Sequence, residues 1–268
     1  MSPSDKNTDK TTSTDSNSVE HEMPLMSHLL ELRTRLLRIV ISIFTVFFSL
    51  FYWATDLYYI LAKPLLAVIP NSSSMIATDV LANFFTPFKL TLVLSIFIAI
   101  PYILSQVWGF IAPGLYKHEK RLAVPLMASS TLLFYLGLVF AYFIVFPVVF
   151  AFFTSVAPEG VVIATDISSY LDFVLKLFFA FGAAFEIPIA IILLCWTGVT
   201  TPNSLRQKRP YVVVGAFVLG MLLTPPDIIS QSMLAIPMLL LFEVGIIIAS
   251  LNHKEDENEG IEDEDHES

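Results

Sequence analysis

Residues 122–158 read LAVPLMASSTLLFYLGLVFAYFIVFPVVFAFFTSVAP, a run of 37 residues without one Asp, Glu, Lys or Arg. A helix needs about 20 mostly apolar residues to cross the ~30 Å hydrocarbon core of a bilayer, because it rises ~1.5 Å per residue. The run is therefore long enough for one transmembrane helix and a lead-out beyond it. It predicts a membrane protein.

Four other uncharged windows approach the length of a span: residues 39–55, 90–116, 187–205 and 210–226. With the apolar segment that ends near residue 251, the windows predict six transmembrane helices, near residues 36–55, 90–111, 122–149, 171–196, 211–226 and 229–251. The fifth is short, because Pro210 opens it and Thr224-Pro225-Pro226 closes it, so the fifth and sixth spans form a short hairpin. We expect an all-α polytopic membrane protein.

Charge is concentrated at the two ends of the chain. The 268 residues are 55% hydrophobic and 15% charged, with a formal net charge of −9. Residues 1–22 hold five acids and two bases, and residues 252–268 hold nine acids and one base, which leaves a net charge of +2 between them. We expect disordered tails at 1–23 and 252–268 around a six-span domain at 24–251. The composition excludes a soluble enzyme, a disordered regulator and a nucleic-acid-binding protein.

Basic residues near the span ends predict the orientation in the membrane. Ten lie on one side of the six spans: Arg33, Arg35, Arg38, Lys117, Lys120, Arg121, Arg206, Lys208, Arg209 and Lys254. The opposite loops contain only Lys63 and Lys89. Because Lys and Arg concentrate in cytoplasmic loops, both tails are expected to be cytoplasmic.

Common catalytic motifs are missing from the sequence, including G-x-x-x-x-G-K-[ST], G-x-G-x-x-G, H-E-x-x-H and G-x-S-x-G. The five histidines all lie outside the predicted spans. The one cysteine, Cys195, lies in an apolar run, where a small buried side chain is expected. We expect no enzymatic activity, no cofactor and no metal site.

Two acids beside the predicted spans are candidate binding residues on the cytoplasmic side. Glu31 lies on the polar face of an amphipathic segment, residues 24–36, and Glu119 lies in a charged run after Pro113-Gly114. Glu31 either pairs with Arg35, four residues on, or binds a cationic partner. Glu119 is either satisfied by neighbouring bases or receives a cation, and local charge alone favours the first interpretation.

A third candidate acid lies inside the membrane. Glu186 is near the middle of the fourth span, beside Pro188, and a charge at the bilayer centre costs about 2.5–3.5 kcal/mol. Glu186 either contacts another helix or faces a hydrated polar notch, and Glu243 in the sixth span raises the same question.

The tip of the predicted hairpin is a candidate docking region. Asp227 is expected to cap the sixth helix. Met221, Thr224 and Gln231 are soft or polar side chains suited to gripping another transmembrane helix.

Several longer motifs resemble the TatC family, the multi-spanning core subunits of bacterial twin-arginine protein translocases. The motifs are HLLELRTR (28–35), MIATDV (75–80), FFTPFKL (84–90), QVWGFIAPGLYKHEKR (106–121), SSYLDF (168–173), FEIPIAI (185–191), LRQKRPYVVVGAFVLGMLLTPPD (205–227) and SQSMLAIPM (230–238). They extend over roughly residues 24–250.

The resemblance implies a concave, glove-like arrangement of six spans in a bacterial inner membrane. It implies recognition of folded precursors that carry twin-arginine signal peptides, with Glu31 and Glu119 accepting the two guanidinium groups. The implied partners are TatA- and TatB-type single-span subunits and other TatC copies. The implied energy source is the proton-motive force rather than a nucleotide.

The resemblance also assigns roles to single residues. Signal-peptide binding would involve Glu31, Glu119, Arg33, Phe110 and Leu115; structure and translocation Pro64, Tyr142, Glu186 and Asp227; and partner docking Met221, Thr224 and Gln231.

Two other functions compete with this interpretation. A secondary transporter could use Glu186 as a proton or ion site, although no internal repeat is visible. An intramembrane protease is disfavoured by the missing nucleophile and base motifs.

Overall fold

The computed structural model describes residues 16–66, 75–111, 123–155, 165–223 and 228–266. These residues are helical almost throughout. The isolated bridge between extended segments among them joins Ile76 to Asp166. In chain order the elements are α1 (Ser16–Leu50), the 3-10 helix η1 (Phe51–Trp53), α2 (Ala54–Leu66), α3 (Ala82–Ile111), α4 (Ala123–Phe140), the π-helix η4 (Ala141–Val145), α5 (Phe146–Ser155), α6 (Ile167–Phe185), α7 (Ile187–Trp196), α8 (Pro202–Gln207), α9 (Arg209–Leu223) and α10 (Ile228–His266).

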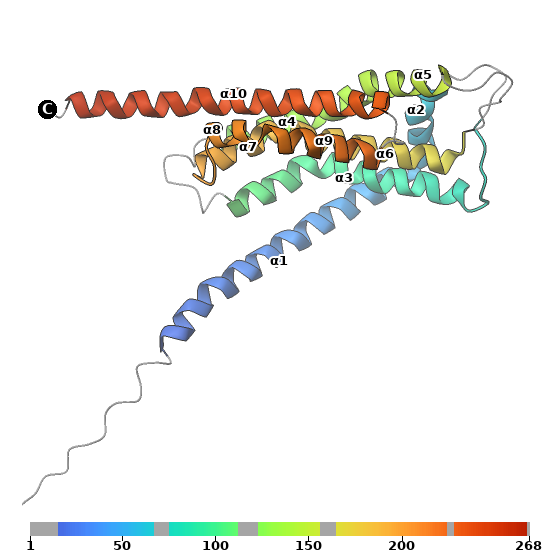
Figure 1. The fold of residues 1–268 in the computed structure, drawn as a ribbon. Coiled ribbons are helices and arrows are strands. Elements are labelled where there is room, and N and C mark those ends of the chain that lie inside the picture. Colours follow the sequence, from blue (N-terminus) through green and yellow to red (C-terminus); the bar gives the residue numbers. More distant parts are fainter. Residues whose placement is uncertain (1–15, 67–74, 112–122, 156–164, 224–227, 267–268) are drawn as a thin grey trace, which may run out of the picture.

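Six helical segments run back and forth between two ends of the molecule (Figure 1): α1, α3, α4 with α5, α6 with α7, α9, and α10. Among the described residues, five helices are long and apolar enough to cross a membrane, and Arg209–Leu223 is a shorter apolar helix. The predicted all-α, six-span fold is confirmed. We call the end that carries Glu31 and Arg206 the terminal end, and the end that carries Ile76 and Asp166 the opposite end.

The fifth span is short, as predicted, because α9 has only 15 residues. The apolar window of α10 is Gln231–Leu251, with 21 residues, so the shortness of the hairpin comes from α9 alone. The helices α1 and α10 both continue into the segments expected to be disordered tails, since they begin at Ser16 and end at His266. Extending an existing helix avoids the cost of nucleating a new one. The division into tails and membrane domain stays a prediction.

Two spans are interrupted, and a proline follows each interruption. Between α4 and α5 the chain widens into the π-helix η4, directly before Phe146-Pro147. Between α6 and α7 the helix breaks at Glu186. Pro188 lacks the N–H that would bond to the carbonyl of Ala184, so the regular ladder cannot continue through this point. Such a break lets a membrane helix carry a polar group where a neighbouring helix can satisfy it.

Apolar side chains of α2, η4, α5 and α6 form a packed cluster in the half of the bundle toward the opposite end. Phe146, Val149 and Phe181 are fully buried in it. The helices α4 and α6 approach closely because Gly137 has no side chain: a Cβ there would come within 2.6 Å of the carbonyl oxygen of Phe181. This contact sets the distance across which polar side chains of α4 and α6 can meet.

Asp166 fastens the segment 75–80 to the start of α6 at the opposite end. Its carboxylate accepts hydrogen bonds from the backbone N–H groups of Ser169 (2.9 Å) and Thr78 (3.2 Å), and from the hydroxyls of both residues. The N–H of Ile167 adds a bond to the carbonyl of Ile76 at 2.9 Å. The bond from the Ser169 N–H, followed by those from Thr78, lowers the pKa of Asp166 to about 2. The carboxylate is therefore the form that holds this junction together.

Candidate functional site

Glu31 and Arg35 form an ion pair on α1 at the terminal end. The Oε1 atom of Glu31 accepts from Nε of Arg35 at 3.0 Å and from Nη2 at 2.6 Å. The side chain of Glu31 is 43% exposed and that of Arg35 is 20% exposed. The pairing within α1 that the sequence predicted as one interpretation is thus present, and it shows that this carboxylate accommodates a guanidinium.

Arg35 also joins α1 to α3. Its Nη1 atom donates to the carbonyl of Gln106 at 3.2 Å, and Nη2 donates to the carbonyl of Gly109 at 3.0 Å. Gly109 lies in the last turn of α3, where carbonyls lack a partner in the helix and carry its negative dipole end, so its carbonyl suits a cation. The close approach needs a glycine, because a Cβ on Gly109 would lie 2.5 Å from Nη1 of Arg35.

A small hollow opens beside this pair, with a volume of about 310 Å³ and a lining of Leu30, Glu31, Thr34, Arg35 and Arg38. Both hydrogen bonds from Arg35 go to Oε1 of Glu31. No described residue donates a hydrogen bond to Oε2, so the carboxylate of Glu31, which lines the hollow, keeps acceptor capacity. The arrangement can therefore receive a second cation without first breaking the pair.

The other residues assigned to the signal-peptide surface are only partly visible. Arg33 is exposed on α1, and Phe110 is half-buried in the last turn of α3, next to Gly109. Glu119 and Leu115 lie outside the described residues. The contact with Gly109 nevertheless brings the α1 pair to the point from which the segment carrying Glu119 leaves α3.

Glu186 is held inside the bundle by a serine of α4. The hydroxyl of Ser130, which is 2% exposed, donates to Oε2 of Glu186 at the break between α6 and α7. The other oxygen, Oε1, is buried and has no hydrogen-bond partner among the described residues. The contact with another helix that the sequence allowed for Glu186 is thus present for one of its two oxygens, Oε2.

Tyr142 and Pro64, which the resemblance grouped by role, are linked through one backbone carbonyl. Pro64 lacks the N–H that would otherwise bond to the carbonyl of Ile60, four residues earlier in α2. The hydroxyl of Tyr142, on the π-helix η4, donates to that carbonyl at 3.1 Å. A similar contact occurs in α3. Pro101 leaves the carbonyl of Phe97 without its helical donor, and the hydroxyl of Tyr135 donates to that carbonyl at 3.1 Å.

The hairpin residues divide between outward and inward side chains. Met221 is 54% exposed on α9. Gln231, by contrast, donates from Nε2 to the carbonyl of Phe217 at 2.7 Å and packs against Gly220, so its amide joins α10 to α9. Thr224 and Asp227 lie outside the described residues.

Glu243 is paired rather than isolated. Its Oε2 atom accepts from Nη2 of Arg209 at 2.6 Å, which joins the start of α9 to α10. The acid in the sixth span therefore contacts another helix.

Sequence reasoning missed three polar contacts. Ser130 was signalled only by the polar run Ser129-Ser130-Thr131 inside a span, and its partner 56 positions away had no local signal. Asp166 has the spacing of a helix cap with Ser169, which was recognisable. The ion pair of Lys89 with Asp172 joins α3 to α6; Lys89 was named only as a base in an opposite loop, and its pairing was not predicted.

The chain was compared with known families, relatives and structures. The family described as Sec-independent protein translocase protein (TatC) matches residues 27–237. The TatC protein of Haemophilus influenzae is 58% identical over 247 residues, which cover 92% of this chain and 96% of the relative. That of Escherichia coli strain K12 is 58% identical over 232 residues, or 87% and 90%.

A crystal structure of a twin arginine translocase receptor, TatC, has a TM-score of 0.75 and 41% identity to this chain, and the match covers 84% of this chain and 98% of that one. The alignment extends over nearly all of the solved chain, so the two folds are compared over most of their length. The chain therefore belongs to the TatC family of Sec-independent protein translocase proteins.

Proposed function

We propose that this protein is the receptor subunit of a twin-arginine translocase, which binds signal peptides with paired arginines and moves folded proteins across the membrane. As a member of the TatC family it is a transport component and not an enzyme. One observation carries the proposal: the Glu31 carboxylate already binds a guanidinium, that of Arg35, and keeps a second oxygen available beside a hollow.

The strength of the internal pair suits exchange with a ligand. Because the side chain of Glu31 is 43% exposed, the pair is expected to contribute only about 0.2–1 kcal/mol. An incoming arginine can bind Oε2, or it can displace Arg35, which then keeps its bonds to the carbonyls of Gln106 and Gly109. A guanidinium can bind both oxygens of a carboxylate with two parallel bonds, whereas a lysine ammonium cannot, so arginine is preferred.

The second signal arginine would bind Glu119, and Arg33, Phe110 and Leu115 would complete the surface. This assignment is supported by the position of Gly109, which brings Glu31 to the end of α3. The terminal end would then face the cytoplasm of a bacterial cell, with the protein in the inner membrane and both termini cytoplasmic. The ten bases on this side support that orientation.

Partner subunits would dock on the hairpin. TatA- and TatB-type single-span proteins are proposed to contact α9 and α10 near Met221 and Thr224, with other copies of this chain completing the complex. The exposure of Met221 supports a contact there. Gln231 would contribute by fixing α10 against α9 rather than by touching the partner. Asp227 would order the tip between them.

Glu186 and Tyr142 are proposed to serve the membrane step driven by the proton-motive force. Glu186 is a carboxyl with one bonded and one unpaired oxygen inside the bundle, and such groups within membrane helices commonly take part in transport. Tyr142 and Pro64 would hold α2 in place against η4.

The receptor assignment is tested by photo-cross-linking a twin-arginine signal peptide to membranes that carry Glu31→Ala, Glu119→Ala or both. We expect each single variant to weaken cross-linking and export, and the double variant to abolish both. Asp56→Ala is the matched control, because Asp56 is an exposed acid at the far end of α1, in the first turn of α2. Unchanged cross-linking and export in the double variant would refute the assignment.

A further inference from the structure

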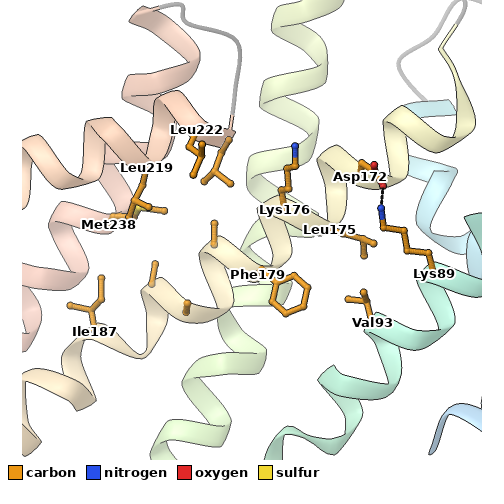
Figure 2. A pocket seen from close by; sticks show the side chains of 14 residues that line it. Lys89, Val93, Asp172, Leu175, Lys176, Phe179, Ile187, Leu219, Leu222 and Met238 are labelled. Atoms are coloured by element: carbon orange, nitrogen blue, oxygen red, sulfur yellow. Dashed lines mark hydrogen bonds and ion pairs between the residues drawn. The ribbon is translucent and has the colours of Figure 1, made fainter. Parts of the chain in front are cut away.

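An elongated groove of about 670 Å³ lies between α3, α6, α9 and α10 (Figure 2). We call it the Lys176 groove. Its walls are mostly aliphatic: Val93 of α3, Leu175 and Ile187 on the two sides of the α6–α7 break, Leu219 of α9 and Met238 of α10. The groove belongs to the membrane-spanning part of the chain, so its apolar walls face either lipid or another apolar molecule.

The charged residues of the groove gather toward the opposite end of the bundle. Lys89 and Asp172 form an ion pair with each other. Lys176, one helical turn after Asp172, is exposed and has no acidic partner among the described residues. Taken together, these three side chains carry a net charge of +1. A ligand that matches this groove is therefore apolar along most of its length and has a single negative charge at one end.

The start of α6 and the end of α9 indicate how deep Lys176 lies in the membrane. Figure 2 shows the order along the groove, with Asp172 and Lys89 first, then Lys176, then Leu222, and Ile187 last. Lys176 is nine residues after the start of α6 at Ile167, which places it ~13 Å along the helix. The short α9 ends at Leu223, which also lines the groove, so the apolar surface of α9 stops close to Lys176. Head groups can approach this point, since the bilayer thins around a short span.

The lining of the groove matches an acyl chain. Such a chain is narrow and apolar, and the groove of about 670 Å³ runs along mostly aliphatic side chains from Lys176 to Ile187.

We propose that the Lys176 groove binds a glycerophospholipid, with its phosphodiester on Nζ of Lys176 and one acyl chain along the apolar wall toward Ile187. The ammonium contributes a charge-assisted hydrogen bond, and the aliphatic walls replace contacts with other lipids. The site is distinct from the receptor surface around Glu31, at the terminal end. The bound lipid fills the space between α6 and the α9–α10 hairpin, and so keeps the hairpin at a fixed distance from the rest of the bundle.

Native mass spectrometry of the full chain in detergent, with phosphatidylglycerol added stepwise, tests the proposal. We expect one lipid to bind more tightly than the rest, and Lys176→Gln to weaken that binding about tenfold. Lys176→Arg should retain it, which shows that the site is intact. Lys63→Gln is the matched control, because Lys63 is an exposed lysine outside the groove at the end of α2. Equal binding by Lys176→Gln and the wild type, or an equal loss in Lys63→Gln, would overturn the proposal.

A second measurement separates the lipid from a protein occupant. Ala183 lines the groove and is exposed in it, so a photoreactive side chain at this position reports on the neighbour in intact membranes. Cross-linking to phospholipid supports the proposal. Cross-linking to a single-span partner subunit in its place overturns it. Inorganic phosphate or a neutral diacylglycerol that competes as well as phosphatidylglycerol would also overturn it, because neither has both the charge and the chain.

Discussion

Replacing Ser130 with alanine removes the hydrogen bond that holds Glu186 at the break between α6 and α7. Ser130 is 2% exposed, so water cannot readily replace its hydroxyl. Oε1 of Glu186 is already buried without a partner among the described residues. Ser130→Ala would therefore leave the whole carboxyl without a donor from that part of the chain.

The expected magnitude follows from two ranges. Leaving a buried polar group unsatisfied costs about 1–3 kcal/mol in soluble proteins. Hydrogen bonds between membrane helices measured by double-mutant cycles average about 0.6 kcal/mol and reach about 1.7. Because no other described residue donates to this carboxyl, we expect Ser130→Ala to lower the free energy of unfolding by about 1–2 kcal/mol.

The assay is a double-mutant cycle with Ser130→Ala and Glu186→Leu, measured by denaturant unfolding of the protein in detergent micelles. The double variant should lose about 1–2 kcal/mol less than the sum of the single losses, because the second change removes a group that no longer has a partner. Ser129→Ala is the control, since the Ser129 hydroxyl donates within its own helix, to the Pro125 carbonyl at 2.9 Å. Losses that add within about 0.5 kcal/mol would refute the coupling.

Three further predictions concern single contacts. Tyr142→Phe should cost about 1 kcal/mol of unfolding free energy, and Pro64→Ala should cancel that loss by returning an N–H to α2, as a second cycle would measure. The pKa of Asp166 lies below its usual value, so the junction between segment 75–80 and α6 should be fully formed above about pH 4 and weaken as the pH falls toward about 2. The thermal unfolding temperature of the wild type should fall over this pH range, and that of Asp166→Asn should not. Gly109→Ala should displace the Arg35 guanidinium, since the new Cβ would lie 2.5 Å from Nη1, and should reduce disulfide cross-linking between cysteines placed on α1 and α3; unchanged cross-linking would contradict the clamp.

The spans were predictable because burial in lipid imposes a composition on each helix. Five charge-free windows and one further apolar segment indicated the six spans, and the prolines at 210, 225 and 226 correctly marked a short fifth helix. The π-helix at Ala141–Val145 was not predicted, since apolar composition does not distinguish a π-helical turn from an α-helical one. The continuation of α10 to His266 runs into the segment expected to be a disordered tail, and that division stays a prediction. Composition reports how well a segment packs and not whether a helix already begun continues through it.

The contacts of the candidate site residues were predictable only where their partners are local. The pairing of Glu31 with Arg35 follows from their separation of four residues. The bonds from Arg35 to Gln106 and Gly109 span more than 70 positions, so only the packing of α1 on α3 creates them. The same holds for Ser130 with Glu186 and for Gln231 with Phe217, in which a side chain on one helix meets a group on another.

Two ion pairs at the terminal end differ in what happens when a ligand competes for the acid. Arg209 has Glu243 as its one acceptor among the described residues, so a competing cation would leave the Arg209 guanidinium unpaired and would loosen α9 from α10. Arg35 has a second set of acceptors in the carbonyls of Gln106 and Gly109, so it stays bonded when Glu31 is taken by another guanidinium. Exchange at Glu31 therefore leaves the α1–α3 contact in place, whereas exchange at Glu243 breaks a helix contact. Of the two exposed carboxylates, Glu31 is the one that can bind and release an arginine repeatedly without disturbing the fold.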